Sequence, residues 1–197
     1  MAKLYFVHSP MNAGKSTRVL QVAHNYERDG NAVALVKSSI DTKGDDTILS
    51  RIGASRKVDI LAGPQTDIRE RVLNLGKGLI VCTIVDEAQF LAPAQVLQLR
   101  ELVDVDNIPV MAFGLRTDFQ RRAFPGSLAL FELADKLEEL KTVCRCMKKA
   151  TFNARLVDGR MVFEGDQVAI DGEANVTYIP LCSSCYREEE QKSNNGE

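Results

Sequence analysis

Apolar runs alternate with amphipathic segments along most of the first 115 residues of this 197-residue chain. Four runs are typical of buried strands and lie at residues 3–9, 31–39, 78–90 and 108–115. Segments with helical spacing lie between them, at residues 16–30, 66–76 and 92–106. Strands that alternate with helices predict an α/β fold with a parallel sheet covered on both faces. The polar, glycine-containing stretch 40–57 predicts a loop that is mostly mobile.

The pattern changes after about residue 143, where short alternating runs, glycines and flanking cysteines take over. A segment of this size buries too little apolar surface to be stable alone, so a metal staple is expected. The polar residues from 187 onward predict little fixed structure. We therefore expect a core over residues 1–143, a small metal-binding domain over 144–190 and a disordered tail over 191–197.

Composition narrows the classes of protein that fit. The formal net charge is -2 and the pI is about 5.8, so nucleic acid is not expected as the main ligand. No apolar run approaches the roughly 18 residues that a membrane helix requires, and the N-terminus lacks the features of a signal peptide. A cytoplasmic protein without a membrane partner is expected, and its five cysteines should be reduced.

The stretch "SPMNAGKST", from Ser9 to Thr17, follows the first strand and opens the first helix. It matches the phosphate-binding loop template except that Ser9 replaces the first glycine. In such loops backbone N–H groups cradle phosphates, a lysine reaches the outer phosphates and a hydroxyl binds Mg²⁺. These roles suit Lys15 and Ser16. The alternative is a simple helix start, which the strand before and the helix after make less favourable.

The most apolar strand ends on Asp86 and Glu87, in "VDEAQF". Carboxyl ends of parallel strands share one edge of a sheet, where ligands bind. Asp86 suits a role beside Mg²⁺, and Glu87 is then placed to accept a proton from an attacking hydroxyl. The alternative is that both carboxylates only cap the next helix. The phosphate acceptor is either water or a bound substrate.

Four cysteines form two close pairs, Cys144 with Cys146 and Cys182 with Cys185. The C-x-x-C spacing is common in zinc sites, and the C-x-C spacing is tighter than usual. A closed Cys₄ zinc site is structural because it has no open position for a substrate. The alternative is a set of reduced thiols in a core. His8 and His24 are distant in sequence and are not expected to be ligands.

These motifs together resemble the type II thymidine kinases, the cytosolic kind, from about Lys3 to Tyr186. The resemblance rests on "SPMNAGKST", "DEAQF", "GLRTDFQ", the cysteine pairs and "YIPLCSSCY". It implies a RecA-like P-loop core and a zinc-held domain called the lasso. It also implies transfer of the ATP γ-phosphate to the 5′-hydroxyl of thymidine, which gives dTMP. The family suggests a homotetramer that is inhibited by its end product dTTP.

The resemblance assigns roles to individual residues, with Glu87 as the general base. It places ATP and Mg²⁺ against Ser9, Pro10, Met11, Asn12, Ala13, Gly14, Lys15, Ser16, Thr17, Asp41, Asp86 and Gln89. It places thymidine against Met11, Leu115, Phe119, Gln167, Val168, Ala169, Ile170, Asp171 and Tyr178. Phe119 is expected to stack on the thymine ring, and residues 167–171 to offer backbone groups to the base edge. Without the resemblance, Leu115 and Phe119 are more typical of core packing.

Some positions depart from the family pattern. Lys43 stands where arginine is frequent, which keeps the charge and loses the bidentate fork. Asn153 stands where a threonine often lines the methyl pocket, so acceptance of deoxyuridine is left open. The lasso is slightly longer before Tyr178.

Two other classes of function fit parts of the chain. A P-loop ATPase or switch would hydrolyse ATP without thymidine. A zinc ribbon that binds nucleic acid would be basic, but Arg145, Lys148, Lys149 and Arg155 are followed by Asp158, Glu164, Asp166 and Asp171, and this mixture argues against it.

Overall fold

A six-stranded parallel sheet forms the core, with strand order β5-β2-β6-β7-β1-β8. The computed structural model describes residues 1–41, 44–168 and 175–194. The strands of this sheet are β1 (Leu4–Ser9), β2 (Ala32–Ser38), β5 (Ile60–Ala62), β6 (Ile80–Asp86), β7 (Val110–Leu115) and β8 (Lys136–Glu139). Every pair of neighbouring strands is parallel. The predicted parallel sheet is therefore confirmed.

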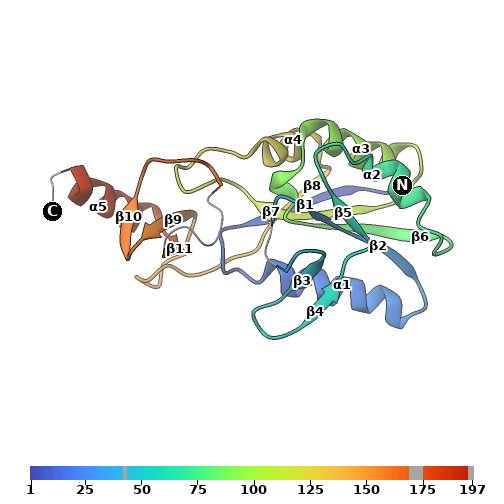
Figure 1. The fold of residues 1–197 in the computed structure, drawn as a ribbon, viewed down its shortest axis with the longest axis horizontal. Helices are drawn as coiled ribbons and strands as arrows, with labels where there is room; N and C mark the ends of the chain where they lie inside the picture. Colours follow the sequence, from blue (N-terminus) through green and yellow to red (C-terminus); the bar gives the residue numbers. More distant parts are fainter. Residues whose placement is uncertain (42–43, 169–174, 195–197) are drawn as a thin grey trace.

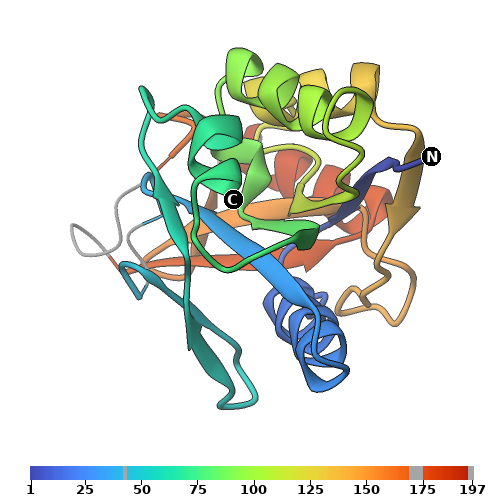
Figure 2. The same cartoon turned by 90° about the vertical axis from the view of Figure 1, so that its right-hand side faces the viewer.

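Helices cover both faces of this sheet, as Figures 1 and 2 show. Helix α1 (Lys15–Arg28) lies on one face, and α2 (Ile68–Leu73), α3 (Pro93–Asp104) and α4 (Pro125–Leu133) lie on the other. Successive side chains of a strand point to opposite faces, so Val7 packs with the α1 cluster and Phe6 with the α3 and α4 cluster. Burial on both faces explains why the central strands are continuous apolar runs.

The stretch expected to be mostly a mobile loop contains a β-hairpin. Strands β3 (Thr47–Leu49) and β4 (Ser55–Lys57) pair antiparallel beside α1. Ile48 is buried in the α1 cluster, and Arg56 forms two hydrogen bonds to Glu27 of α1, each 2.6 Å long. One buried apolar side chain and one bidentate ion pair hold the hairpin against the helix, and neither partner is close in sequence.

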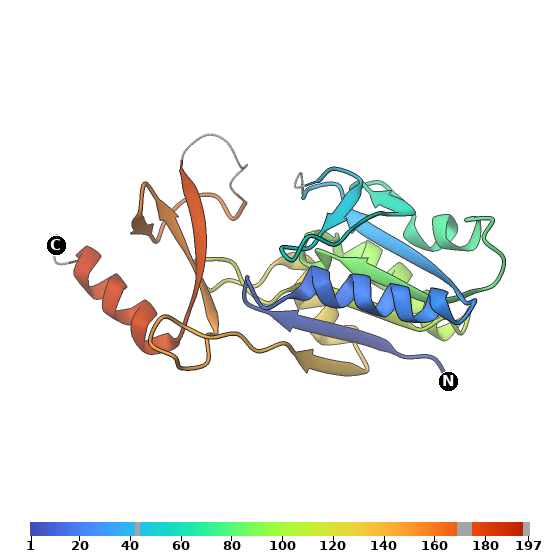
Figure 3. The same cartoon turned by 90° about the horizontal axis from the view of Figure 1, so that it is seen from below.

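The C-terminal part forms a separate three-stranded antiparallel sheet, ordered β10-β9-β11. It contains β9 (Phe152–Val157), β10 (Arg160–Val162) and β11 (Val176–Leu181), followed by α5 (Ser183–Asn194). Figure 3 shows this sheet beyond the end of the core toward which the arrow of β1 points. The Tyr186 hydroxyl donates to the Phe119 carbonyl at 2.6 Å, which ties α5 to the core. A small C-terminal sheet is thus present in addition to the core sheet, as the expected fold class requires.

Helix α5 extends into the segment that the sequence predicted to have little structure. Arg121 pairs with Glu190 at 2.7 Å, and Arg145 pairs with Glu189. These acidic residues look like a solvated run in the sequence, but they face basic groups from distant segments. Within the described ranges, no helix combines the length and the apolarity needed to cross a membrane.

Candidate active site

A cavity of about 710 Å³ opens at the carboxyl ends of the core strands, between the core and the C-terminal sheet. Most of the predicted site residues that the structure describes line it, from several separate segments. These are Met11, Asn12, Gly14, Lys15, Ser16, Thr17, Asp41, Asp86, Glu87, Gln89, Leu115, Gln167, Val168 and Tyr178. The predicted ATP- and thymidine-binding residues that do not line it, among those described, are Ser9, Pro10, Ala13 and Phe119.

The loop between β1 and α1 has the backbone of an anion-binding turn. Asn12 and Gly14 both have positive φ, at 65° and 81°, and Gly14 is the N-cap of α1. Positive φ next to a helix start turns backbone N–H groups toward one point and adds the positive end of the helix dipole. Ser9 occupies the place of the usual glycine, and its hydroxyl accepts a hydrogen bond from Lys15 Nζ at 3.2 Å.

Asp86 is the last residue of β6 and is buried. Burial and the neighbouring carboxylate of Glu87 raise the pKa of Asp86 to about 7, although Lys15 and hydrogen bonds from Glu87 N–H and Ser16 act in the opposite direction. Burial lowers the pKa of Lys15, and Glu87 and Asp86 counteract this. Asp86 and Lys15 therefore affect each other's pKa, the charge of Glu87 affects both, and Ser16 contributes to the pKa of Asp86.

Glu87 is held in an unusual backbone conformation, with φ at 52°. A positive φ is uncommon for a residue with a side chain and is often found at functional sites. Gln89 Nε2 donates to Glu87 Oε2 at 2.6 Å, while Gln89 Oε1 accepts from Leu115 N at 3.0 Å. The carboxylate is thereby fixed against β7, and it lines the cavity.

The helix-capping alternative for the two acids does not match the geometry. The N-cap of α3 is Ala92, five residues beyond Glu87. Glu87 precedes the short 3₁₀ turn η1 (Ala88–Phe90), but its side chain accepts no capping hydrogen bond there. The acidic pair therefore faces the phosphate loop and the cavity.

Asn153 of β9 links three segments at the other side of the cavity. Its Oδ1 accepts from Met11 N at 2.7 Å, and its Nδ2 donates to the Thr117 carbonyl at 3.2 Å. Asn153 also lines the cavity. Asn153, which stands where a threonine often lines the methyl pocket of the family, therefore also connects the phosphate loop to the segment after β7.

Phe119 does not line the cavity in this structure. It is buried, and the guanidinium carbon of Arg155 lies 3.7 Å from the centre of its ring. Its expected stacking on thymine stays a prediction. Its neighbour Asp118, which no local sequence pattern singles out, does line the cavity. Asp118 accepts hydrogen bonds from Gln120 N at 2.9 Å and Arg122 N at 2.8 Å.

The lasso residues are described only in part. Gln167 and Val168 line the cavity, and Gln167 Nε2 donates to Asp118 Oδ2 at 2.9 Å. The predicted contacts of Ala169, Ile170 and Asp171 lie outside the described residues, as does Lys43.

Lys37 and Arg51 also line the cavity, and the sequence analysis did not identify either of them. Lys37 is buried and pairs with Asp41 at 3.0 Å. Arg51 comes from the turn between β3 and β4. Arg51 was missed because its approach to the cavity depends on the hairpin, which the sequence did not predict. Lys37 lies near the carboxyl end of β2, inside an apolar run typical of core packing.

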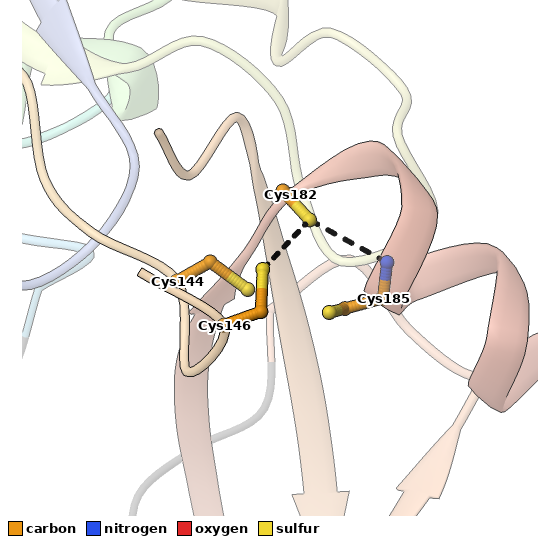
Figure 4. Close-up of side chains that lie close together, drawn as sticks. All are labelled: Cys144, Cys146, Cys182 and Cys185. Atoms are coloured by element: carbon orange, nitrogen blue, oxygen red, sulfur yellow. Dashed lines mark hydrogen bonds between the residues drawn. The ribbon is translucent and has the colours of Figure 1, made fainter. Parts of the chain in front are cut away.

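The four paired cysteines converge at one point, as Figure 4 shows. Their sulfur atoms all lie within 4.8 Å of one another, and the Cys146 and Cys182 sulfurs are 3.6 Å apart. Zinc with Zn–S bonds of about 2.3 Å places its sulfurs about 3.8 Å apart at the corners of a tetrahedron. The set therefore fits a structural zinc ion.

Hydrogen bonds favour the thiolate form of Cys144 and Cys182, whereas hydrogen bonds to the neighbouring sulfurs and burial raise the pKa of Cys185 to about 12. Cys185 N donates to Cys182 Sγ at 3.5 Å. Burial tends to raise the pKa of Cys144, but hydrogen bonds from the backbone of Cys146 and Cys182 outweigh it and lower this pKa to about 6. The thiolate is the form that binds zinc.

Comparison with known proteins identifies the family of this chain. The family model described as thymidine kinase matches residues 2–186. A thymidine kinase of Ruegeria pomeroyi is 48% identical over 191 residues, which cover 95% of each chain. Thymidine kinases of Lactococcus lactis and Lactobacillus acidophilus are 46% and 43% identical, and each match covers 94% of this chain and at least 96% of the relative. The chain therefore belongs to the thymidine kinase family.

Proposed function

We propose that this thymidine kinase transfers the γ-phosphate of ATP to the 5′-hydroxyl of thymidine within the described cavity. The observation that carries the proposal is that the phosphate loop, Asp86 and Glu87 share one cavity with Leu115, Gln167 and Tyr178. A phosphate site alone would fit many P-loop proteins. The large space between the core and the C-terminal sheet supplies room for an acceptor next to it.

ATP binds with its outer phosphates at the loop. The N–H groups around Gly14 and the start of α1 face the phosphates, and Lys15 exchanges its bond to Ser9 for the outer phosphate oxygens. Ser16 and Asp86, which both line the cavity beside Lys15, are the residues that would hold Mg²⁺. When bound, this cation neutralises charge that develops on the phosphate oxygens.

Glu87 acts as the general base. It takes the proton from the 5′-hydroxyl as the bond between that oxygen and the γ-phosphorus forms and the bond to the ADP oxygen breaks. The hydrogen bond from Gln89 occupies one carboxylate oxygen and leaves the other to receive the proton. The products are dTMP and ADP.

Thymidine lies between the loop and the lasso. Met11, Leu115 and Tyr178 form walls of its pocket, and residues 167–171 bind the base edge. Stacking of Phe119 on the base requires its ring to leave the buried position beside Arg155. Zinc at the four cysteines holds Cys144 and Cys146 against Cys182 and Cys185, which flank the segment containing the lasso. From the family we also propose a homotetramer, inhibition by dTTP and a cytosolic location.

The direct test is incubation with Mg²⁺–ATP and a panel of nucleosides that includes thymidine, deoxyuridine, deoxycytidine and adenosine. We expect a 5′-monophosphate from thymidine, identified by chromatography and phosphorus NMR. ATP consumption without any nucleotide product would indicate an ATPase and would refute the proposal. The yield from deoxyuridine relative to thymidine measures how strongly the site recognises the methyl group.

A further inference from the structure

Arg155, in the middle of β9, is a buried cation that none of the roles above includes. Its Nε donates to the Tyr178 hydroxyl at 2.8 Å, and its Nη2 donates to the Gln167 carbonyl at 3.1 Å. Its guanidinium also lies over the ring of Phe119. One side chain therefore contacts three residues that the thymidine site is expected to use.

Two of these partners mark the ends of the lasso segment. Gln167 precedes the stretch 168–177, and Tyr178 follows it on β11. Tyr178 is the direct partner of Arg155 across the antiparallel β9 and β11 pair. Gln167 and Tyr178 line the cavity, whereas Arg155 lies behind them. Arg155 thus bridges the two ends of the segment 168–177 and does not itself line the cavity.

The chemistry of these contacts orients the Tyr178 hydroxyl. A guanidinium has five N–H donors and no acceptor, so the hydroxyl oxygen must accept from it. The hydroxyl hydrogen then points away from Arg155. Among the described residues, the ion pairs include none to Arg155, and its polar partners are neutral oxygens. Loss of either hydrogen-bond partner would leave N–H donors of a buried cation unsatisfied, which costs free energy.

We propose that Arg155 is a positioning residue for the nucleoside, which sets Tyr178 as a hydrogen-bond donor to a carbonyl oxygen of the base. This inference rests on the proposed function. Glu87 must lie beside the 5′-hydroxyl, so the base extends from it toward the C-terminal sheet that carries Tyr178. A donor fixed there favours bases with carbonyl groups, such as thymine and uracil.

The test is a double-mutant cycle with Arg155→Met and Tyr178→Phe, measured by thymidine and ATP kinetics and by thymidine calorimetry. Each single variant is expected to raise the KM and Kd for thymidine about tenfold, the loss of one well-made hydrogen bond. The ATP KM is expected to change less than about twofold. Because the residues act in series, the double variant should also lose about tenfold rather than about a hundredfold.

Base analogues supply a readout that a purely structural role would not change. Sulfur accepts hydrogen bonds more weakly than oxygen, so the parent should discriminate against 2-thiothymidine or 4-thiothymidine. Arg155→Met and Tyr178→Phe should both reduce this discrimination. Arg160→Met, at an exposed position on the neighbouring strand β10, is the matched control and should behave like the parent.

The inference is overturned if thymidine affinity is unchanged in either variant, if the ATP KM rises equally, or if the two losses multiply. Should Arg155→Met fail to fold, Tyr178→Phe with the thio analogues decides alone, since it leaves the buried arginine in place. Calorimetry separates this result from the proposed function. A parent that fails to phosphorylate thymidine refutes the function, and thymidine binding still tests Arg155.

Discussion

The raised pKa of Asp86 predicts that binding of Mg²⁺–ATP depends on pH near neutrality. A carboxylate must be ionised to bind a metal ion, and burial together with the charge of Glu87 raises this pKa to about 7. A group with such a pKa is about 90% ionised at pH 8 and about 10% ionised at pH 6. The affinity for Mg²⁺–ATP should therefore fall by about tenfold over this interval, or about 1.4 kcal/mol.

Isothermal titration calorimetry at several pH values tests this prediction. ATP itself titrates in the same range, so Asp86→Asn is the reference, because it retains the ATP contribution and removes the carboxyl group. Glu87→Gln should shift the midpoint to lower pH, since it removes a charge that raises the Asp86 pKa. Glu138→Gln, at an exposed position on β8, makes the same charge change far from Asp86 in the sequence and should leave the midpoint in place.

The same group affects stability with a defined sign. The pKa of Asp86 is higher in the folded than in the unfolded chain, so the folded state binds the extra proton. This stabilisation is complete below about pH 4 and is lost as the pH rises through about 7, a change on the order of 4 kcal/mol. Denaturant unfolding without nucleotide, compared with Asp86→Asn, measures it. Equal pH slopes for the parent and Asp86→Asn, in binding and in unfolding, would refute the reasoning.

Three further predictions concern catalysis, the metal and packing. Glu87→Gln should lower kcat by about 10²–10⁴-fold and keep ATP binding, because the amide oxygen can still accept from Gln89; turnover at the parent rate would exclude Glu87 as the base. Cys182→Ser should lower the zinc content measured by elemental analysis and raise the thymidine KM far more than the ATP Kd, because an unanchored lasso must be ordered at each binding event. If Cys182→Ser lowers only the melting temperature and leaves the thymidine KM unchanged, the zinc site serves stability alone. Gly126→Ala places a Cβ 2.6 Å from the carbonyl oxygens of Ala88 and Leu91, which should cost about 1–3 kcal/mol in the free energy of unfolding and lower kcat by displacing Glu87. Gly63→Ala, whose Cβ makes only ordinary contacts at 3.7 Å, is its control, and equal losses in both variants would contradict the packing argument.

Local sequence patterns predicted the framework of the site. The four central strands and α1 are recognisable because burial on both faces requires continuous apolar runs, and because Gly14, Lys15 and Ser16 occupy adjacent positions in one loop. Asp86 and Glu87 were predictable for a related reason, since the end of a parallel strand sets their location at the ligand-binding edge. The two cysteine pairs were also predictable as candidate metal ligands, because metal sites often use cysteines at short spacings.

Other elements depend on partners that are distant in the chain. The β3 and β4 hairpin needs Glu27 and the α1 cluster, so its polar sequence alone suggested a mobile loop. Helix α4 and strand β8 were not predicted, because α4 is positioned by packing against α3, η1 and β1, and β8 by pairing with β1. Helix α5 continues to Asn194 because its acidic residues meet Arg121 and Arg145.

The sequence by itself determined the fold class, through the order of its apolar and amphipathic runs. It also located the phosphate-loop motif, the acidic pair and the two cysteine pairs, because each of these motifs depends on residues within a few positions of one another. Only the tertiary structure decided which side chains reach the cavity from different segments. It buried Phe119 beneath Arg155, and it placed Asp118 against Gln167, 49 residues away. It also attached Gln89 to β7 and so fixed Glu87. Hydrogen bonds and ring contacts of this kind act over a few ångströms in space, and separation along the chain does not reveal them.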